Sequence, residues 1–388
     1  KKKADTNHVV KIVNYKYYTA KQANNFANYL KSKNKEIKTI PQDELVRRVE
    51  NWNFIKQPPL FFCFCDEYTK NTHSIEEYRK LDLADYDEIC IDGGVILDED
   101  QISDKENINS YKVFNPQINT AKTYKIVAPD LYYSKTAKIR LVQGSQGMRV
   151  FRNKYKIIWK TRFNGRFQFS YEPDLLLNGN QSLVLSSDNY EEILFLLSLL
   201  NSRLSLFLLE KSLKIPNEAI YLVALKSIKQ YIRIPIITTK NQAIKNEIIK
   251  QTEVMLNLEK VILKDIVNFS GINVQKFDMI RASGGNLILT RNEIDYKCKI
   301  KNGKNEFVQK LVTETFFNNG MILNKEIILS ELKTLSAIDF DKQAMIKNYI
   351  DDLVFALYFN ISLLKLGVLE ALNVKKLCQK NKFYEYIF

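Results

Sequence analysis

Between residues 123 and 187 the sequence is a succession of short apolar and β-branched runs divided by turn residues. The runs are shorter than ordinary helices, and the turns contain Gly144, Gly147, Asn164-Gly165 and Asn178-Gly179. Asn-Gly between two such runs favours the positive φ angles of a tight hairpin turn. We therefore expect a mostly antiparallel sheet whose strands lie at 124–128, 138–142, 150–159, 166–171 and 182–185.

Helical patterns follow this strand-rich block. Residues 189–211 are apolar over most of a helix circumference, with Asp188 as the expected N-cap and Glu191 three residues further on, as in a capping box. A second long helix is expected at 241–267, because Ile244, Ile248, Met255, Leu258 and Ile262 would share one face. Residues 341–359 are the expected partner helix. The strand-like segment 231–236 contains Pro235, which argues against a central place in a sheet.

The residues before the strand-rich block are less regular. A helix is expected at 20–32 after Thr19, and a turn at Pro58-Pro59 precedes an apolar run, 60–65, that fits a buried strand. A loop-rich stretch then extends to 117. We expect an α+β fold with three parts: a mixed α/β linker region at 1–117, a strand-rich domain at 118–240, and a long helix, a mixed insertion and C-terminal helices at 241–388.

The location of the charge is more informative than its total. The chain carries a net charge of +14. Residues 66–106 hold fourteen acidic and four basic side chains, whereas residues 122–170 hold twelve basic side chains and one acidic residue, Asp130. Most of the positive excess therefore lies in the strand-rich block, where it favours contact with a polyanion.

We interpret this basic block as a nucleic-acid interface. Lysine and arginine neutralise phosphates, and arginine and glutamine can also bond to base edges in the major groove of DNA. Arg152, Lys154 and Lys156 would share one face of a strand, because residues two apart point the same way. The candidate contacts are Lys125, Lys135, Lys138, Arg140, Gln143, Gln146, Arg149, Arg152, Lys154, Lys156, Lys160, Arg162 and Arg166.

Other chemistries have less support in the residues. Cys63, Cys65 and His73 supply three zinc ligands where a structural site needs four. Gln57-Pro58-Pro59-Leu60 lacks the aromatic residue of an amino-methyltransferase loop, and no glycine-rich nucleotide loop follows a strand. Asp295-Tyr296-Lys297 and Glu36-Ile37-Lys38 have the acid-x-lysine form of some nucleases, without an upstream Pro-Asp partner. We expect no catalytic residues and no metal site in this chain.

The cysteines and the apolar runs bear on location. Five cysteines without disulfide-type spacing favour a reducing compartment, so we expect a cytoplasmic protein. Charged or polar residues interrupt the apolar runs before about 18 positions, and we expect no membrane segment. The chain starts with Lys1 rather than methionine, and we expect it to be part of a longer protein.

Two segments resemble a known family. Residues 181–236 contain Leu199-Leu200-Asn201-Ser202-Arg203-Leu204 and, later, Ile232-Arg233-Ile234-Pro235-Ile236; residues 350–358 read Ile-Asp-Asp-Leu-Val-Phe-Ala-Leu-Tyr. Together these are similar to the C-terminal target-recognition (specificity) domain of Type IIG and Taq-like adenine-specific restriction-modification DNA methyltransferases. A weaker likeness covers Ile40-Pro41-Gln42-Asp43-Glu44-Leu45 and Trp52. The chain departs from the family pattern at Ile237 and Phe359, where proline and glycine are common.

The resemblance implies different roles for the strand-rich block and for the helical motifs. The strand-rich block would read double-stranded DNA in a bacterial restriction-modification system, and the two helical motifs would be its scaffold. It implies an S-adenosylmethionine-dependent adenine methyltransferase, and possibly a Mg-dependent nuclease, located upstream or on another chain. The alternatives are a free-standing specificity subunit, a small Mg-dependent nuclease, and an RNA-binding protein that uses its interleaved aromatic and basic residues.

Overall fold

The computed structural model describes residues 9–13, 37–41, 59–79, 89–93, 95–115, 120–121, 124–127, 131–141, 147–164, 167–177, 182–213, 220–318, 321–322, 327–363 and 369–388. The chain divides into two compact units, Lys1–Phe64 and Cys65–Phe388. In the first unit, strands β1 (Val9–Val13) and β2 (Ile37–Pro41) form an antiparallel pair. The helix expected at 20–32 lies outside the described residues. Helices and mostly antiparallel strands alternate along the chain, so the predicted α+β class is confirmed.

The strand expected at 60–65 is wrong, because these residues form part of a helix. Helix α3 spans Pro59–Lys70. Phe61, Phe64 and Tyr68 are buried, and their spacing of three and four residues places them on one helical face. A short apolar run fits a buried strand and a buried helix equally well, and here the continuation of the helical period to Tyr68 indicates the helix.

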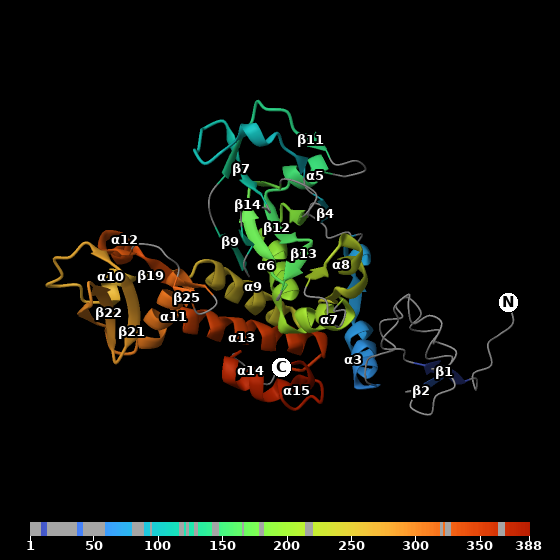
Figure 1. The fold of residues 1–388 in the computed structure, drawn as a ribbon. Coiled ribbons are helices and arrows are strands. Elements are labelled where there is room, and N and C mark those ends of the chain that lie inside the picture. Colours follow the sequence, from blue (N-terminus) through green and yellow to red (C-terminus); the bar gives the residue numbers. More distant parts are fainter. Residues whose placement is uncertain are drawn as a thin grey trace, which may run out of the picture. The chain divides into compact units, whose positions relative to one another are not determined.

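The main sheet has six strands in the order β4-β16-β12-β14-β9-β8. Figure 1 labels four of them, β4, β12, β14 and β9. All neighbouring strands are antiparallel except β14 and β9, which confirms the mostly antiparallel sheet. In chain order the strands are β4 (Cys90–Gly93), β8 (Thr120–Ala121), β9 (Tyr124–Val127), β12 (Tyr155–Lys160), β14 (Ser170–Pro173) and β16 (Ser182–Ser187).

The main sheet is covered on both faces. Ile157, Ile158 and Trp159 of β12 are all fully buried, and successive side chains in a strand point to opposite faces. Helix α6 (Tyr190–Asn201) packs against β12 and β16. Ile158 also shares a core cluster with residues of helix α5 (Gly147–Arg152) and of strand β7 (Ser110–Phe114).

A second, four-stranded sheet has the order β15-β7-β10-β6. Strand β10 is Leu131–Ser134, β15 is Leu175–Leu177 and β6 is Ile102–Ser103. Next in the chain to these strands, β5 (Val95–Ile96) pairs with β11 (Arg140–Leu141), and the short 3-10 helix η3 spans Glu99–Gln101. The acidic stretch that we expected to be loop-rich therefore supplies β4 to the main sheet and β6 to this one.

The two Asn-Gly pairs differ in how the strands around them are paired. Strand β13 (Arg162–Asn164) pairs with β17 (Ile220–Leu222), and β15 pairs in parallel with β7. The runs predicted on either side of Asn164-Gly165, 150–159 and 166–171, do pair antiparallel, as β12 and β14. The hairpin predicted at Asn178-Gly179 is wrong, because β15 and β16 belong to different sheets. Gly165, Asn178 and Gly179 themselves lie outside the described residues. The local turn preference was outweighed by long-range pairing, through which Leu175 is buried in a core with Phe114 and Ile158.

Four helices, α6, α7 (Arg203–Leu213), α9 (Gln242–Leu256) and α13 (Phe340–Tyr358), form a scaffold that contacts the main sheet through α6. Helix α7 follows α6 after a break at Ser202, whose backbone is extended. Helix α6 packs against α9, which in turn packs against α13, so the predicted helix pair is confirmed. Helix α9 is shorter than expected: Leu258 and Ile262 lie beyond its end.

The N-cap of α6 differs from the predicted residue. The side chain of Asn189 accepts a hydrogen bond from the Glu192 amide at 3.1 Å. The expected cap, Asp188, instead accepts from the Lys154 amide at 2.6 Å. Among the described residues no single helix is long and apolar enough to cross a bilayer; α6 and α7, bent by 53°, reach that length and composition as a pair.

Shorter elements complete the scaffold. Strand β18 pairs with β3 as a two-stranded sheet, which agrees with the edge position expected from Pro235. Helix α14 packs against α13, and α15 packs against α7. The bounds are β3 (Thr72–Ser74), α4 (Ile75–Arg79), α8 (Leu225–Tyr231), β18 (Arg233–Pro235), α14 (Ala371–Cys378) and α15 (Tyr384–Ile387).

Residues 257–339, which we call the insert, have a core of their own between α9 and α13. A three-stranded antiparallel sheet, β21-β22-β23, packs against α11, and Gly284-Gly285 forms its first turn with both φ angles positive (Figure 1). The insert contains β19 (Lys260–Ile262), α10 (Leu263–Ile266), β20 (Lys276–Phe277), β21 (Met279–Ser283), β22 (Asn286–Arg291), β23 (Ile294–Lys299), α11 (Asn305–Phe316), β24 (Phe317–Asn318), β25 (Met321–Ile322), β26 (Ile327–Ile328), α12 (Leu329–Thr334) and β27 (Ser336–Ile338).

The two sequence motifs of the resemblance contact each other and the main sheet. The Asn201 side chain accepts from the Phe169 amide at 3.1 Å and donates to the Phe169 carbonyl at 2.8 Å, just before β14. Two residues later, the Arg203 amide at the start of α7 donates to the Asp351 carboxylate of α13 at 2.9 Å. Lys347 also donates to Asp351, at 2.5 and 2.6 Å. The motifs are therefore structural.

We expect Asn201→Ala to lower the free energy of unfolding by about 1–3 kcal/mol, because the buried Phe169 amide would lose its hydrogen-bond acceptor. The measurement is urea unfolding followed by circular dichroism. Asn348→Ala, at an exposed position of α13, is the matched control and should change stability by less than about 0.5 kcal/mol. Equal stabilities for the two variants would contradict the structural role of Asn201.

Candidate nucleic-acid interface

The predicted face of Arg152, Lys154 and Lys156 does not exist. The run at 150–159 divides into the end of α5, where Arg152 lies, and strand β12, which starts at Tyr155. Arg152 and Lys154 are exposed, whereas Lys156 is 1% exposed and donates to the Asn153 carbonyl at 2.5 Å. The period-two argument failed because a helix interrupts the run, and Lys156 cannot reach a ligand in this conformation.

A cavity of about 700 Å³ brings together two of the candidate cations, Lys135 and Arg152. Lys135 follows β10, and Arg152 ends α5, so the cavity lies where the four-stranded sheet meets α5 and the turn after β14. It is lined by Glu106, Ser110, Tyr111, Lys112, Tyr132, Lys135, Ile139, Phe151, Arg152, Pro173, Asp174 and Leu175. An adjoining cavity of about 470 Å³ shares Glu106, Ser110 and Tyr132 with it.

The cavity contains both hydrogen-bond donors and acceptors. Lys135 and Arg152 are cationic, and Glu106 and Asp174 supply carboxylates. Lys112 also lines it, but its ammonium is 2.9 Å from the Glu172 carboxylate and is therefore partly neutralised. The Lys135 ammonium lies over the ring of Tyr111, another lining residue, 5.3 Å from its centroid.

The remaining described candidates lie outside this cavity. Lys138 and Arg162 are exposed, in the loop before β11 and in β13 respectively. Arg140 is exposed but its guanidinium is 2.6 Å from the Asp98 carboxylate. Lys154 is exposed, with its ammonium 5.2 Å from the Tyr155 ring centroid. Lys160 is half-buried, and burial lowers the pKa of its ammonium.

Several candidates fall outside what the structure describes. Gln143, Gln146 and Arg166 lie in undescribed segments. Lys125 belongs to β9 and Arg149 to α5, but their side chains are also outside the described set. These five residues therefore stay predictions.

Sequence reasoning missed the part of the cavity that comes from the acidic stretch and from β7. Glu106, Tyr111 and Lys112 precede the basic block, and Asp174 interrupts the strand region. The β-type run at 110–114 was the available signal, because alternating polar and apolar residues ending in Val-Phe favour a half-buried strand. We expected loop there because acidic residues surround it.

The residues considered for other chemistries are engaged elsewhere or apart. The Asp295 carboxylate accepts from Arg281 at 2.5 Å and from the Thr290 hydroxyl at 2.6 Å on the surface of the insert. Cys63 and Cys65 lie on α3, whereas His73 lies in β3. Among the described residues, no three His, Cys, Asp or Glu side chains are grouped to hold a metal ion.

Comparison with known proteins gives similar structures only. No family model matches the chain, and no curated protein does. The chain is similar to the S subunit of a Type I restriction-modification system from M. genitalium, with 12% identity, 77% of this chain and 93% of that chain covered, and a TM-score of 0.27. It is also similar to the type IIG restriction endonuclease BpuSI, with 14% identity, 84% of this chain and 36% of that chain covered, and a TM-score of 0.29. The matched part spans about a third of that enzyme.

Lys156 should make folding stability depend on pH. Burial lowers the pKa of its ammonium from 10.5 to about 8, so the folded protein releases this proton at lower pH than the unfolded chain. Between pH 8 and 10 the unfolded chain binds more protons, and this group therefore raises the free energy of unfolding as pH rises, by at most about 1.4 kcal/mol per pH unit. Lys156→Met removes the group. We expect the variant to be the more stable protein at pH 7, by up to about 3 kcal/mol.

The measurement is urea unfolding of both proteins at pH 7, 8, 9 and 10. Their difference in stability cancels the other titrating groups and should shrink as pH rises. Lys154→Met, which removes an exposed ammonium two residues earlier, should show no such trend. A constant difference for Lys156→Met would contradict the burial of its ammonium.

Proposed function

We propose that this chain reads a short sequence in double-stranded DNA as the target-recognition module of a restriction-modification enzyme. The observation that carries the proposal is the cavity between the four-stranded sheet and α5, where the basic and acidic segments of the chain meet. Methylation of adenine with S-adenosylmethionine, and any cleavage with magnesium, would belong to parts outside these residues. The sequence resemblance is the support for that finer assignment.

The composition of the cavity suits base edges better than phosphates. Phosphates require donors alone, whereas base edges in the major groove present both donors and acceptors. Arg152 can donate to the two acceptors of guanine, and a carboxylate such as Asp174 or Glu106 can accept from the amino group of cytosine. A cavity with both kinds of group can therefore discriminate between base pairs.

Exposed cations elsewhere in the strand-rich block would supply the phosphate contacts. Lys138, Lys154 and Arg162 are exposed, and none of them forms an ion pair with another described residue. Such contacts fix the position of a protein on the duplex and carry no sequence information. The scaffold contact between Arg203 and Asp351 supports the resemblance, because it joins the two motifs on which the resemblance rests.

We expect Lys135→Ala with Arg152→Ala to weaken or change sequence preference. The experiment selects bound molecules from a pool of random duplexes and sequences them. Wild type should enrich a short motif, and the double variant should lose discrimination at one or more positions and bind the enriched site about 10- to 100-fold more weakly.

The control is Lys376→Ala with Lys380→Ala, which removes the same charge from exposed positions on and just after α14. This variant should enrich the wild-type motif. The proposal fails if wild type enriches no motif, or if the Lys135 and Arg152 variant selects the same motif with the same affinity.

A further inference from the structure

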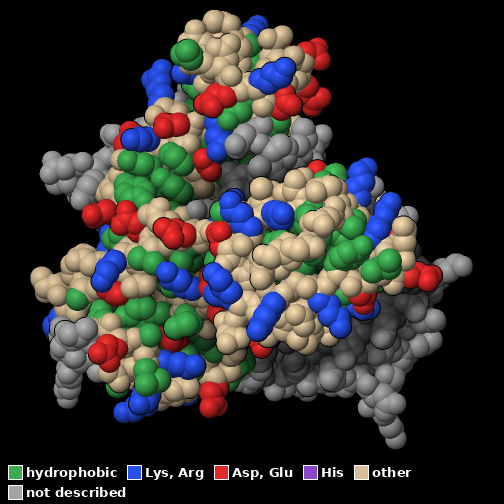
Figure 2. Space-filling view, turned by 90° about the vertical axis from the view of Figure 1, so that its left-hand side faces the viewer, with side chains coloured by type: hydrophobic (Ala, Val, Ile, Leu, Met, Phe, Trp, Pro, Cys, Tyr) green, Lys and Arg blue, Asp and Glu red, His purple; other side chains and the backbone are tan. Residues whose placement is uncertain are grey.

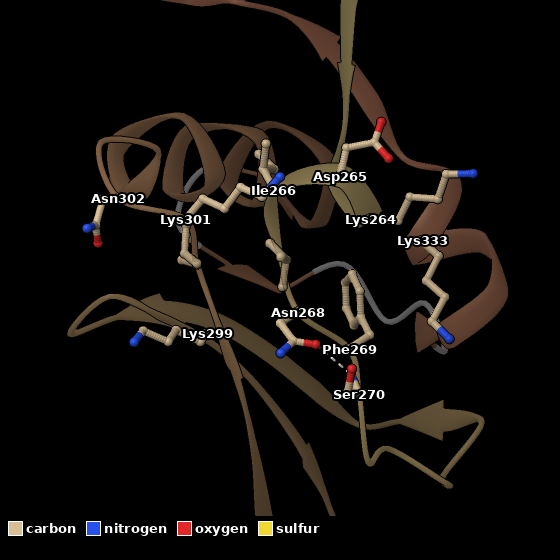
Figure 3. Close-up of a pocket in the computed structure, with 12 residues that line it drawn as sticks. Lys264, Asp265, Ile266, Asn268, Phe269, Ser270, Lys299, Lys301, Asn302 and Lys333 are labelled. Atoms are coloured by element: carbon tan, nitrogen blue, oxygen red, sulfur yellow. Dashed lines mark hydrogen bonds between the residues drawn. The ribbon is translucent and has the colours of Figure 1, made fainter.

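The insert has a cleft of about 970 Å³ whose charged lining is dominated by lysines. Lys264, Lys299, Lys301 and Lys333 line it, and Asp265 is the acidic residue among the lining side chains. Figure 3 shows Lys299 and Lys301 on one side of Phe269 and Lys264 and Lys333 on the other. In Figure 2, which faces the side where the insert is labelled in Figure 1, Lys and Arg side chains are prominent near the middle.

A backbone bridge fixes one wall of the cleft. Val267 and Ile300 face each other in an antiparallel bridge, the Asn268 amide donates to the Lys299 carbonyl at 2.9 Å, and the Lys301 amide donates to the Ile266 carbonyl at 2.8 Å. Val267 and Ile300 are buried in the insert core, so their neighbours Lys299 and Lys301 are exposed on the other side of the chain.

Two short helices form the opposite wall. Lys264 lies in α10 and Lys333 in α12, and the two helices pack against each other. The Leu263 amide donates to the Leu335 carbonyl at 2.8 Å, which holds the helices together beside the cleft. The Lys333 ammonium is 5.9 Å from the centroid of the Phe269 ring at the base of the cleft.

Three cations of the insert outside the cleft are paired with carboxylates. Arg281 pairs with Asp295, Arg291 with Asp278, and Lys304 with Asp339. In the part of the chain that the structure describes, none of the four cleft lysines is within ion-pair distance of a carboxylate. Their positive charge is therefore not neutralised internally, and the cleft favours an anionic ligand.

The neutral lining groups point to phosphate as that anion. The side-chain oxygen of Asn268, Oδ1, already accepts a hydrogen bond from the Ser270 amide at 2.9 Å. The side-chain NH₂ group of Asn268 is therefore the part that can donate to a ligand. Phe269 is 9% exposed and offers no open ring for a base to stack on. Unlike the cavity of the strand-rich block, this cleft offers lysine ammonium groups as separate point charges with one carboxylate among them.

We infer that the insert cleft binds the sugar-phosphate backbone of duplex DNA without reading its sequence. This inference rests on the proposed function, which makes duplex DNA the polyanion that the chain meets. Lysines on two separate walls suit successive phosphates of a strand better than one small anion. The cleft would thus add affinity and salt dependence, and the cavity with Arg152 would add selectivity.

The test is a triple variant, Lys264→Ala, Lys299→Ala and Lys301→Ala, which keeps Lys333 over Phe269. Binding to a duplex of arbitrary sequence is measured by fluorescence anisotropy at several NaCl concentrations. Each phosphate contact contributes about 0.9 to the slope of log affinity against log salt, so the slope should fall by about 2 to 3. The motif enriched from random duplexes should stay that of wild type.

The matched control removes three exposed lysines elsewhere, Lys250→Ala, Lys376→Ala and Lys380→Ala, and should change the slope by less than 1. Thermal unfolding of both variants checks that they are folded. Competition with inorganic phosphate, at an ionic strength matched with chloride, tests for a small-anion site. An unchanged slope in the cleft variant, or displacement of DNA by phosphate but not chloride, would overturn the inference.

The two proposals can fail separately. If wild type enriches a motif and the cleft variant keeps the full salt slope, the function stands and the cleft inference is wrong. If wild type binds duplex DNA without any sequence preference and the cleft variant loses that binding, the cleft inference stands and target recognition is wrong. If wild type prefers duplex RNA to duplex DNA of the same sequence, both are wrong.

Discussion

The side-chain amide of Asn201 connects the helical scaffold with the main sheet. It accepts a hydrogen bond from the Phe169 amide and donates one to the Phe169 carbonyl. Because Asn201 ends α6 and Phe169 precedes β14, this buried amide fixes the position of the sheet relative to the helix. An apolar residue of the same size would leave the Phe169 amide unsatisfied in the interior, which explains an asparagine at a fully buried position.

The acidic and basic segments of the chain are interleaved in space, although they are separate in the sequence. Asp98 neutralises Arg140, and Glu106 lines the same cavity as Lys135 and Arg152. The resulting surface is less positive than the local sequence charge suggests. Hydrogen-bond donors and acceptors both line the cavity, and under the proposed function this mixture would allow base pairs to be discriminated. The insert shows the opposite arrangement, with three ion pairs outside the cleft and lysines left inside it.

The sequence predicted the helical scaffold better than the sheets. The apolar stripe of Ile244, Ile248 and Met255 identified α9 and its partner α13, because helical periodicity is a local property. The α+β class and most strands of the main sheet were predictable for the same reason. Strand pairing was not, since β15 joins β7 and β13 joins β17 from distant parts of the chain. Leu60 to Cys65 was also ambiguous, because a short apolar run has no period of its own.

For the site, charge density located the region but not the geometry. Arg152 and Lys135 were in the predicted set and do line the cavity, whereas Lys156 was in the set and is buried. Nothing in a run of alternating cations shows that α5 ends within it. The acidic residues of the cavity were not predicted, because the site was predicted from clustered positive charge and carboxylates do not contribute to such a cluster.

The chain passes back and forth between the two sheets as it runs from β4 to β16. Strands β6 and β7 belong to the four-stranded sheet, β8 and β9 to the main sheet, and β10 to the four-stranded sheet again. In the sequence, β15 of the four-stranded sheet comes between β14 and β16 of the main sheet. Genetic recombination with a crossover inside this stretch would therefore leave both sheets with strands from different parents. Under the proposed function, a new specificity would therefore require exchange of the whole block from Cys90 to Leu222, or substitution of individual side chains at the cavity, rather than transfer of one half of the block.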